Sequence, residues 1–515
     1  MKSKVMNVSD ALDLIKDGDL VALSAVSKIG WPEYIIDHLE KRYLARKSPG
    51  SLTILSGCGQ ETNHFAHPGF LKRFIASHPK TAPELLKMAA NNEVEGYVLP
   101  QGVLQQLYRS SGAKQPGLLT KIGMGTYIDP RQEGGKINDS AKEDIVRTME
   151  IDGEEWLFYK SFPINVSLIR GTTADEFGNV TIEEEAMKLE ILETALAAKA
   201  TRGKVVVQVK HLAVGGSLKA KDIIIPGELV DAIVVCEDPE TYHKQTLGSF
   251  YNPSFSGELK APGQAAFAEE KPVLEGSDII CRRGVYEIFP GAVVNLGAGL
   301  GAGVGSAAAI EGIVKEITFT VELGAVGGTP QAFPYFPASV NPSAFLAHPS
   351  MFDFYHGGGL DITFLGIAQI DCVGNVNASK FDGVTAGQGG FIDISQSSRK
   401  VVFCTYFNAK GLNTSFVGGK LTIVQEGKIP KFVHKVDQIT FNGPMAQKRG
   451  AKVVVCTERA VFELTEGGLT LTEIAPGADL EKDILAQMEF KPLISDNFKT
   501  MDSRIFVPGR MGCFD

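Results

Sequence analysis

A chain of 515 residues, of which 44% are apolar and 22% charged, is long and apolar enough to form at least two domains with large cores. Its formal net charge is −9 and no block of lysine or arginine is present, which argues against a binding surface for nucleic acid or an anionic membrane. The seven cysteines are scattered and never spaced C-x-x-C, so the sequence predicts no disulfide framework and no metal site, and it fits a reducing cytoplasm.

The N-terminal region alternates short helices with strands. It begins with MKSKVMNVSDALDLIKDG, which has no long apolar core behind its lysines and therefore does not resemble a signal peptide. Ser9 is expected to cap a helix, which is followed by a strand at 20–23, a helix from Pro32 to about Tyr43 and a strand at 52–55. Strands that alternate with helices are typical of a mostly parallel sheet.

The middle of the chain continues this pattern. Helices are predicted over 83–91 and 102–110, and IGMGTY at 122–127 forms a glycine-rich turn. The strands at 204–209 and 230–236 are valine-rich and nearly unbroken, as expected for strands that are buried on both faces. We therefore predict an α/β fold with open, mostly parallel sheets.

A change of composition at 246–272 marks the predicted domain boundary. This segment mixes proline, glycine, serine and charged residues without a sustained period. We therefore assign 1–245 to an N-terminal domain, 246–272 to a linker and 273–515 to a C-terminal domain. A helix is predicted over 279–288, soon after the linker.

Two features indicate that the domains are copies of one α/β unit. The helix at 279–288 is followed by a strand, a turn, a helix and a strand, which repeats the order of elements at 9–55. The pattern Asp-x-x-Gly-Asn-Val also occurs once in each half, at 175–180 and at 371–376. Two similar domains of this kind would each bury their own sheet.

The functional prediction depends on residues 291–330. A short β-branched strand at 293–296 is followed by five glycines within 297–305, which let the backbone turn tightly and approach a ligand closely. These glycines would also weaken any membrane-spanning helix in this apolar window. Because the glycines are expected to delay the next helix, we predict that it is capped by Ser306 and covers 307–315.

Glu322 follows the next predicted strand, at 317–321, and is the candidate catalytic carboxylate. Ligands bind outside the carboxyl ends of strands in open parallel sheets, and Gly324 and Gly327-Gly328 would let other backbone approach Glu322. A fixed, desolvated carboxylate can attack a carbonyl when donors stabilise the oxyanion, and the turn at 123–125 can provide such donors. A solvated acidic residue at a strand end is the alternative interpretation.

The same glycine run matches a second function. Gly297-x-Gly299-x-x-Ala302 follows a strand, precedes a helix and has an acidic residue about twenty positions further on, which satisfies the dinucleotide fingerprint. Glu322 would then bind a ribose hydroxyl. From the residues alone, a nicotinamide site and another anion-binding turn remain equally open.

The other glycine clusters and the closest histidine pair are interpreted individually as structural. Gly357-Gly358-Gly359 and Gly387-x-Gly389-Gly390 fit tight turns at strand ends, although three clusters in one half lead us to expect at least one ligand contact. His64 and His67 have i, i+3 spacing but no third ligand nearby, so they do not predict a metal site.

Five longer segments are similar to one known family. They are KIGMGTYIDPRQEGGKIN (121–138), RGVYEIFPGAVVNLGAG (283–299), TVELGAVGG (320–328), FDFYHGGGLD (352–361) and TERAVFELTEGGLTLTEIAPGADL (457–480). Together they resemble the class I coenzyme A transferases, in particular the single-chain acetate or propionate CoA-transferases, over nearly the whole chain. The resemblance implies two similar CoA-transferase domains, which are NagB-RpiA-like.

The resemblance also implies roles for particular residues. In such enzymes the glutamate of the motif TVELGAVGG is the nucleophile, which implies Glu322. A glycine-flanked motif supplies backbone amides as an oxyanion hole, which implies Gly123, Met124 and Gly125. Here this motif ends in Tyr127 instead of the usual phenylalanine, and Ser24-Ala25-Val26 replaces a glycine-rich loop. The other residues implied to bind substrate or CoA are Gln101, Gly297, Ala298, Gly299, Gly389 and Gly390.

The implied reaction moves CoA between a short-chain acyl-CoA and a free carboxylate of the acetate or propionate type. It follows a ping-pong course through a glutamyl-CoA thioester on Glu322. No cofactor is implied, because CoA is a substrate and one thioester replaces another. We expect a homo-oligomer, either a dimer or a tetramer. The alternatives are an NAD-dependent oxidoreductase that uses the turn at 297–302, a non-catalytic ligand sensor and an acyl-CoA thioesterase.

Overall fold

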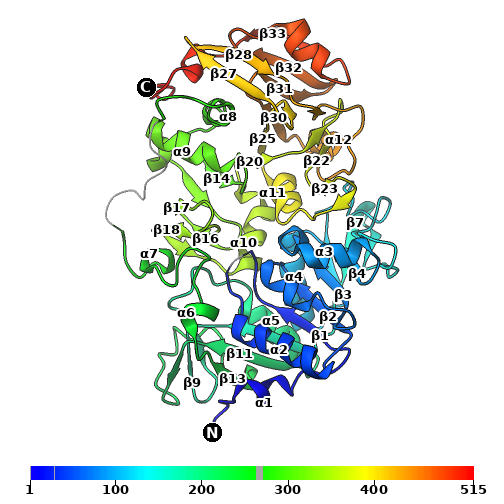
Figure 1. Cartoon of the computed structure of the whole chain (residues 1–515), viewed down its shortest axis with the longest axis vertical. Helices are drawn as coiled ribbons and strands as arrows, with labels where there is room; N and C mark the ends of the chain where they lie inside the picture. Colours follow the sequence, from blue (N-terminus) through cyan, green and yellow to red (C-terminus); the bar gives the residue numbers. More distant parts are fainter. Residues whose placement is uncertain (1, 28, 262–270) are drawn as a thin grey trace. The chain divides into compact units, whose positions relative to one another are not determined.

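The computed structural model describes residues 2–27, 29–261 and 271–515 (Figure 1). The contacts between residues divide the chain into two compact units, each made of three segments. Unit 1 comprises Met1–Ala261, Val321–Asp353 and Val384–Asp393, and unit 2 comprises Pro262–Thr320, Phe354–Gly383 and Ile394–Asp515. The domain boundaries at 245 and 273 stay a prediction, and residues 262–270 of the proposed linker lie outside the described residues.

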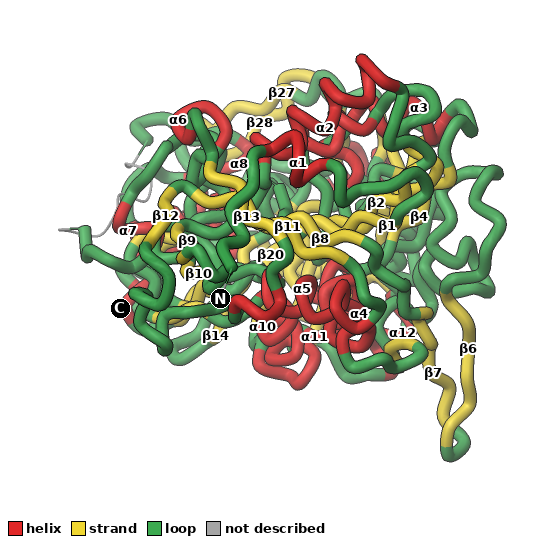
Figure 2. The backbone as a smooth tube through the Cα atoms, turned by 90° about the horizontal axis from the view of Figure 1, so that it is seen from below, coloured by secondary structure: helices red, strands yellow, loops and turns green. Residues whose placement is uncertain are grey.

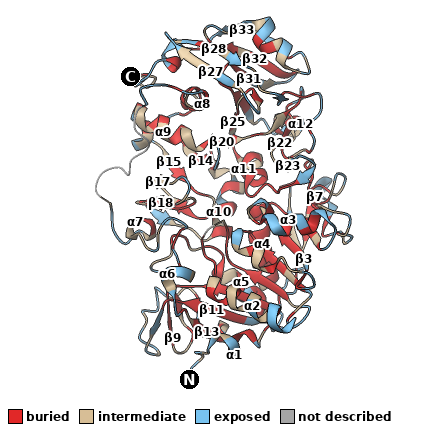
Figure 3. Ribbon diagram, in the orientation of Figure 1, coloured by how far each residue is buried: buried red, intermediate tan, exposed pale blue. Residues whose placement is uncertain are grey.

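Unit 1 is built on a seven-stranded parallel sheet with the strand order β13-β11-β8-β1-β2-β3-β4. Every residue of β1 and β8 is buried, as Figure 3 shows for much of this sheet in red. The four predicted strands that belong to this sheet are confirmed. In chain order its strands are β1 (Leu20–Leu23), β2 (Leu52–Ser56), β3 (Leu71–Ala76), β4 (Glu95–Val98), β8 (Val166–Arg170), β11 (Lys204–Val209) and β13 (Ala232–Val235).

Helices cover both faces of this sheet (Figure 2). One face carries α1 (Val8–Leu12), α2 (Glu33–Arg46) and α3 (Pro83–Ala90), and the other carries α4 (Gln101–Gly112) and α5 (Ile191–Ala200). A continuous apolar core fills the space between the first three helices and the strands. The predicted mostly parallel α/β architecture is therefore confirmed for unit 1.

Smaller elements complete unit 1. Two three-stranded sheets flank the main one, with the orders β5-β7-β6 and β10-β9-β12. Their strands are β5 (Gly117–Thr120), β6 (Val146–Ile151), β7 (Glu154–Lys160), β9 (Thr173–Asp175), β10 (Val180–Thr181) and β12 (His211–Ala213). Further short elements are α6 (Pro239–Tyr242), α7 (Pro253–Ser256), β16 (Ala325–Val326), β17 (Thr329–Pro330), β18 (Ser339–Val340), β19 (Ala344–Phe345) and most of α10 (His348–Phe354).

Unit 2 contains a second mostly parallel sheet, in which the strands run in the order β15-β14-β20-β25-β30-β31-β32-β33. The first five are parallel to one another, and β31 is antiparallel to both β30 and β32. These strands are β14 (Val293–Leu296), β15 (Thr318–Thr320), β20 (Ile362–Gly366), β25 (Lys400–Cys404), β30 (Lys452–Cys456), β31 (Ala460–Thr465), β32 (Gly468–Ile474) and β33 (Leu493–Thr500). The helices α8 (Gly276–Val285) and α9 (Ala302–Glu311) pack together within the apolar core of this unit.

The start predicted for the helix after β14 is wrong. Helix α9 begins at Ala302 rather than after Ser306, and Gly303 and Gly305 lie inside it. A Cβ atom on Gly303 would lie 2.6 Å from the Cys281 Sγ, so glycine here lets α9 approach α8 closely. Tertiary packing therefore outweighs the low helix propensity of glycine.

The predicted cap of the first helix is also wrong. The Asn7 side chain accepts the N–H of Asp10 at 2.9 Å, so α1 begins at Val8 and Asn7, rather than Ser9, is the cap. Both residue types are good N-caps, and the hydrogen bond decides between them.

The two Asp-x-x-Gly-Asn-Val segments form the same turn, at 175–180 in unit 1 and at 371–376 in unit 2. In each, the aspartate Oδ1 accepts the N–H groups of the residues two and four positions further on. In each, the asparagine Oδ1 accepts the N–H of a distant glycine, Gly227 or Gly443. Matching turns of this kind are what an internal duplication predicts.

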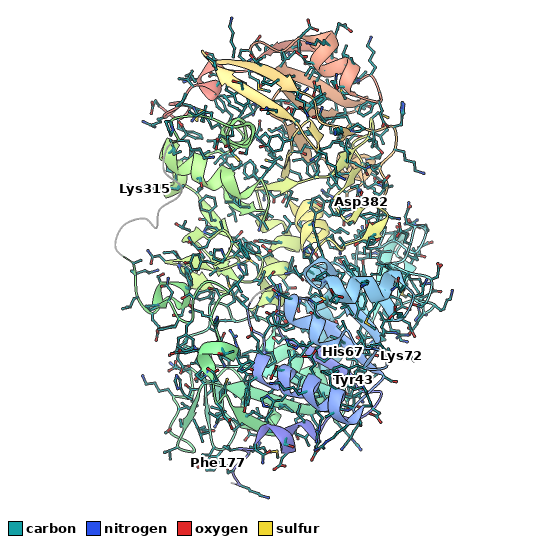
Figure 4. The ribbon with its side chains drawn as sticks, in the orientation of Figure 1. Tyr43, His67, Lys72, Phe177, Lys315 and Asp382 are labelled. Carbon is teal, nitrogen blue, oxygen red and sulfur yellow. The ribbon has the colours of Figure 1, made fainter. Side chains whose placement is uncertain are left out.

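His64 and His67 bind the same carboxylate. His64 Nδ1 and His67 Nε2 lie 2.5 and 2.6 Å from the Glu40 oxygens. The rings of His67 and Tyr43, which Figure 4 labels, each contact Phe70. Across the described residues, no group of three or more His, Cys, Asp or Glu is arranged to hold a metal ion. Likewise, none of the described helices has the length and hydropathy needed to cross a membrane.

Candidate active site

Glu322 lies in a tight turn two residues after β15, and its side chain is half-buried. The N–H of Val321 donates to the carbonyl oxygen of Ala325 at 2.9 Å, which closes the turn around Glu322. Gly324 has a φ of +128°, and a Cβ atom there would lie 2.2 Å from the Leu346 carbonyl oxygen. The Leu346 N–H in turn donates to the Gly324 carbonyl oxygen at 2.9 Å, so only glycine fits this turn.

The strand that leads to Glu322 is anchored at its end within unit 2. Thr320 is the last residue of β15, and its Oγ1 accepts the Tyr355 hydroxyl at 2.8 Å. The Asn295 side chain also lies 3.4 Å from the Thr320 carbonyl oxygen. Because Asn295, Thr320 and Tyr355 are all buried, the end of β15 is held firmly within unit 2.

Two of the backbone amides expected at 123–125 already have acceptors within their own loop. Both flanking glycines have a positive φ, as the glycine-rich turn predicts. The N–H of Met124 donates to the Lys121 carbonyl oxygen at 3.2 Å, and the N–H of Gly125 donates to the Asp129 carboxylate at 2.9 Å. These two amides could donate to an oxyanion only after their hydrogen bonds within the loop open.

Tyr127 ends this loop and is held by a glutamine from a distant segment. Its buried hydroxyl donates to Oε1 of Gln388. Gln388 stands between Gly387 and Gly389, which have φ values of +81° and +57°. The N–H of Gly389 donates to the Ser77 carbonyl oxygen at 2.9 Å, directly after β3. The loop around Gln388 is therefore docked on the carboxyl end of the unit 1 sheet.

Gln101 lies against the same loop and belongs to a buried hydrogen-bonded chain. Its N–H donates to the Gly389 carbonyl oxygen at 3.1 Å, and its Nε2 lies 2.9 Å from the His348 Nε2. The Nδ1 of His348 lies 2.8 Å from the Glu190 carboxylate, and both of these side chains are 0% exposed. An amide nitrogen only donates, so His348 accepts at Nε2 and donates from Nδ1 to Glu190.

His78 is a further ionisable neighbour of this loop. Its side chain adjoins Gly389, and burial together with the charge of Lys80 lowers the pKa of His78 to about 4. The His78 imidazole is therefore neutral at pH 7. It adds a polar but uncharged group to this part of unit 1.

Most of the predicted site residues are thus linked inside unit 1. Hydrogen bonds connect the loop that ends in Tyr127 to Gln388, and connect Gly389 to Gln101. The His348 side chain lies next to the Gln101 amide, and Leu346 stands two residues before His348 in the sequence. Leu346 holds the Glu322 turn through its hydrogen bond to Gly324. The predicted residue Gly390 follows Gly389 and is buried in the same unit.

The residues predicted at 297–299 lie in unit 2, and they differ in what they can contact. A Cβ atom on Gly297 would lie 2.9 Å from the Phe364 carbonyl oxygen, so close packing on β20 explains this glycine. Ala298 and Gly299 are exposed, and a Cβ atom on Gly299 would meet nothing within 4 Å. Gly299 also lines a pocket of about 320 Å³ formed by residues of α8 and α9. Ala298 and Gly299 are therefore accessible to a ligand.

Three polar residues of this network were not singled out in the sequence. Glu190 and His348 stand 158 positions apart and carry no local motif, so their pairing could not be seen. Gln388 is the residue written as x in the glycine cluster Gly387-x-Gly389-Gly390. That cluster was the one signal that could have drawn attention to it.

Known proteins similar to this chain identify its family. Residues 5–236 match the family model described as Coenzyme A transferase. The chain is 42% identical to caffeate CoA-transferase of Acetobacterium woodii, an alignment that covers 98% of this chain and 97% of the relative. It is 40% identical to acetate CoA-transferase YdiF of Escherichia coli K12, over 99% of this chain and 96% of the relative. The chain belongs to the coenzyme A transferase family.

Solved structures agree with this assignment. This CoA-transferase superposes with a TM-score of 0.92 on an acyl-CoA transferase from E. coli O157:H7, YdiF, solved as a thioester complex with CoA. The two are 38% identical, and the match covers 99% of this chain and 97% of the other. A Streptococcus mutans protein described as the putative α subunit of citrate lyase is 14% identical with a TM-score of 0.52, which indicates a shared fold alone.

The family settles the choice between the functions left open by the residues. The protein is an enzyme that transfers CoA, and acyl-CoA and carboxylates are its classes of substrate. The oxidoreductase, sensor and thioesterase interpretations are not favoured, because the relatives that match the whole chain are CoA-transferases. The predicted delay of the helix after this glycine run is no argument against a nucleotide fingerprint at 297–302, because α9 begins at Ala302.

Proposed function

We propose that this CoA-transferase exchanges CoA between a short-chain acyl-CoA and a carboxylate of the acetate or propionate type, with Glu322 as the nucleophile. The observation that carries the proposal is the position of Glu322, a half-buried carboxylate held in a glycine turn at the end of a parallel strand. Support for the substrates comes from the 40% identical relative that is named acetate CoA-transferase. Support for a thioester comes from the CoA complex of the 38% identical YdiF.

The reaction begins when the Glu322 carboxylate attacks the acyl carbonyl of acyl-CoA. The C–S bond breaks, CoA leaves as a thiolate, and an acyl-glutamyl anhydride remains. The thiolate then attacks the glutamyl carbonyl, which gives the glutamyl-CoA thioester and releases the first acid. A second carboxylate reverses these steps, so ping-pong kinetics follow. One thioester replaces another, so the scheme needs no ATP, metal or cofactor, and CoA binding remote from the reacting atoms can lower the barrier.

Other residues have supporting roles in this proposal. The amides of residues 123–125 stabilise the oxyanion, which requires Met124 and Gly125 to exchange their internal acceptors for it. The remaining contacts with substrate or CoA are assigned to Gln101, Tyr127, Gly297, Ala298, Gly299, Gly389 and Gly390. Among these, the exposed Ala298 and Gly299 are the better supported CoA contacts in unit 2.

Incubation with acetyl-CoA alone tests the nucleophile. We expect the intact mass of the protein to rise by CoA minus one water, because the glutamyl-CoA thioester accumulates when no acceptor acid is present. The adduct should be absent from Glu322→Ala and should form normally in Glu316→Ala, which removes an exposed glutamate close in sequence. An adduct that persists in Glu322→Ala would overturn the assignment.

We also propose a homo-oligomer in a reducing cytoplasm. All seven cysteines are free, and five of them are buried. Burial raises the pKa values of Cys58 and Cys281 to about 12, which keeps both as thiols. Size-exclusion chromatography with light scattering would measure the oligomeric state, and a monomer would contradict the proposal.

A further inference from the structure

Gln388 carries a buried hydrogen-bond donor that the network described above does not use. The residue is 6% exposed, and its Oε1 accepts the Tyr127 hydroxyl. Its Nε2 is buried and has no hydrogen-bond partner among the described residues. Leaving an amide donor unpaired in a protein interior is costly, so one that is retained beside a functional site calls for an explanation.

The backbone on either side of Gln388 is held in place. Gly387 has a φ of +81°, and a Cβ atom there would lie 2.8 Å from the Ser77 carbonyl oxygen. On the other side, Gly389 is fixed by hydrogen bonds to Ser77 and Gln101. A loop held at both ends fixes the position from which the Gln388 side chain extends.

Tyr127 fixes the orientation of this amide. A hydroxyl donor on Oε1 leaves Nε2, with its two N–H groups, directed away from the Tyr127 ring. The phenylalanine usual at the position of Tyr127 in similar enzymes would leave the amide free to rotate. Tyr127 is also only two residues after Gly125, so the free donor lies next to the loop assigned to the reacting carbonyl.

We propose that Gln388 selects the acyl group, by donating from Nε2 to an oxygen on the carbon next to the reacting carbonyl. The preferred substrates are short carboxylic acids with a hydroxyl or keto oxygen on the second carbon, rather than unsubstituted acids of the same length. A site built to hydrogen-bond a substrate oxygen discriminates strongly against an analogue that lacks it, because the buried donor then stays unpaired. The inference rests on the proposed function, since loop 123–127 and Glu322 define where the acyl group binds.

A panel of acids that differ by one oxygen tests this preference. With acetyl-CoA as the donor, kcat/KM is measured for propionate, 2-hydroxypropionate, 2-oxopropionate and 3-hydroxypropionate. We expect the 2-substituted acids to exceed propionate by about tenfold or more, and 3-hydroxypropionate to gain less, because its oxygen lies one carbon too far. Equal values for propionate and both 2-substituted acids would overturn the proposal.

Variants assign the preference to the Gln388 amide. Gln388→Met keeps the length of the side chain without the donor, so the ratio of 2-hydroxypropionate to propionate should fall about tenfold. Tyr127→Phe should lower the same ratio by a smaller factor. The matched control is Gln105→Met, because Gln105 is another buried glutamine whose amide is unpartnered among the described residues. A ratio unchanged in Gln388→Met, or lowered equally in Gln105→Met, would overturn the proposal.

The CoA adduct separates this inference from the proposed function. If the adduct forms on Glu322 but the ratios do not change, the transfer mechanism stands and the role of Gln388 is wrong. If no adduct forms in the wild-type protein, the mechanism itself is wrong. The wild-type panel reports on the preference even if Gln388→Met fails to fold.

Discussion

At the scale of single residues, the Glu190–His348 pair decides how Gln101 is presented. The His348 ring lies between the Glu190 carboxylate and the Gln101 amide, at 2.8 and 2.9 Å, with no exposed surface on either Glu190 or His348. The carboxylate holds the proton on Nδ1, so Nε2 can accept only from the amide nitrogen of Gln101. If Gln101 contacts substrate as proposed, the pair acts on substrate through Gln101 rather than directly.

The substitution Glu190→Gln tests this positioning role. Replacing the carboxylate weakens a buried, charge-assisted hydrogen bond, so we expect the free energy of unfolding to fall by about 1–3 kcal/mol, measured by urea denaturation. Release of Gln101 should also lower kcat/KM for the acceptor acid by about 10- to 100-fold. Glu193→Gln is the control, because Glu193 is another carboxyl shielded from solvent, three residues after Glu190. Burial raises the pKa of the Glu193 carboxyl. A loss of stability without a change in kcat/KM would contradict the positioning role.

Local sequence patterns could indicate Glu322 but not the residues that surround Gln388. Glu322 follows a strand and precedes a glycine, and both features are visible within ten residues. Gln388 is defined by Tyr127, which lies 261 positions away, and by a left-handed backbone on either side. Contacts over such separations depend on the fold, which no short window of sequence contains.

At the scale of elements, the turn between β15 and β16 depends on one glycine. We expect Gly324→Ala to destabilise the protein by more than about 2 kcal/mol, because a φ of +128° is strained for alanine and the new Cβ meets the Leu346 carbonyl oxygen. Displacement of Glu322 should lower kcat/KM by about 100-fold. Thermal unfolding and steady-state kinetics measure the two effects.

The control for this substitution separates the effect of backbone strain from the effect of a steric clash. Gly312 ends α9 with a φ of +85°, and a Cβ atom there would meet nothing within 4 Å. Gly312→Ala should therefore cost only about 1 kcal/mol and leave kcat/KM unchanged. Equal losses of activity in both variants would contradict the assignment of the turn at Gly324.

Elements with a strong repeating pattern were predicted closely, whereas helix starts were not. The valine-rich strand β11 has the bounds predicted for it, because a strand buried on both faces must be apolar throughout. Helix α9 begins four residues before Ser306, where glycines had argued against a helix. There the decisive factor is Cys281 on α8, which leaves no room for a side chain at Gly303.

At the scale of the whole molecule, the repeated motif is visible in the sequence but the division into compact units is not. The two aspartate turns share a motif and form the same hydrogen bonds, so the pattern at 175–180 and 371–376 was informative. Unit 1, in contrast, takes in 321–353 and 384–393 through contacts such as those of Gly389. Tertiary contacts decide which late segments of the chain belong to unit 1.

The stability of the whole protein should depend on pH through histidines that are buried without charge. Burial, together with the charge of Arg170, lowers the pKa of His243 to about 4, although Glu185 lies 3.1 Å from its Nε2. Burial similarly lowers the pKa of His78 to about 4. In the unfolded chain both histidines titrate near pH 6.5. The unfolded state therefore binds more protons than the folded state between about pH 6.5 and pH 4.

Stability consequently falls as the pH falls through this window, by up to about 3 kcal/mol for His243 alone. Burial by itself would raise the pKa of Glu185, but the charge of Arg170 and the hydrogen bond from His243 lower it, so its contribution is lost at still lower pH. Urea denaturation at pH 7, 6, 5 and 4.5 measures the slope. His243→Gln should remove about half of it, since His78 remains. The exposed His211 provides the control, and His211→Gln should keep the wild-type slope. A slope that is the same in wild type and His243→Gln would mean that His243 is already charged in the folded protein.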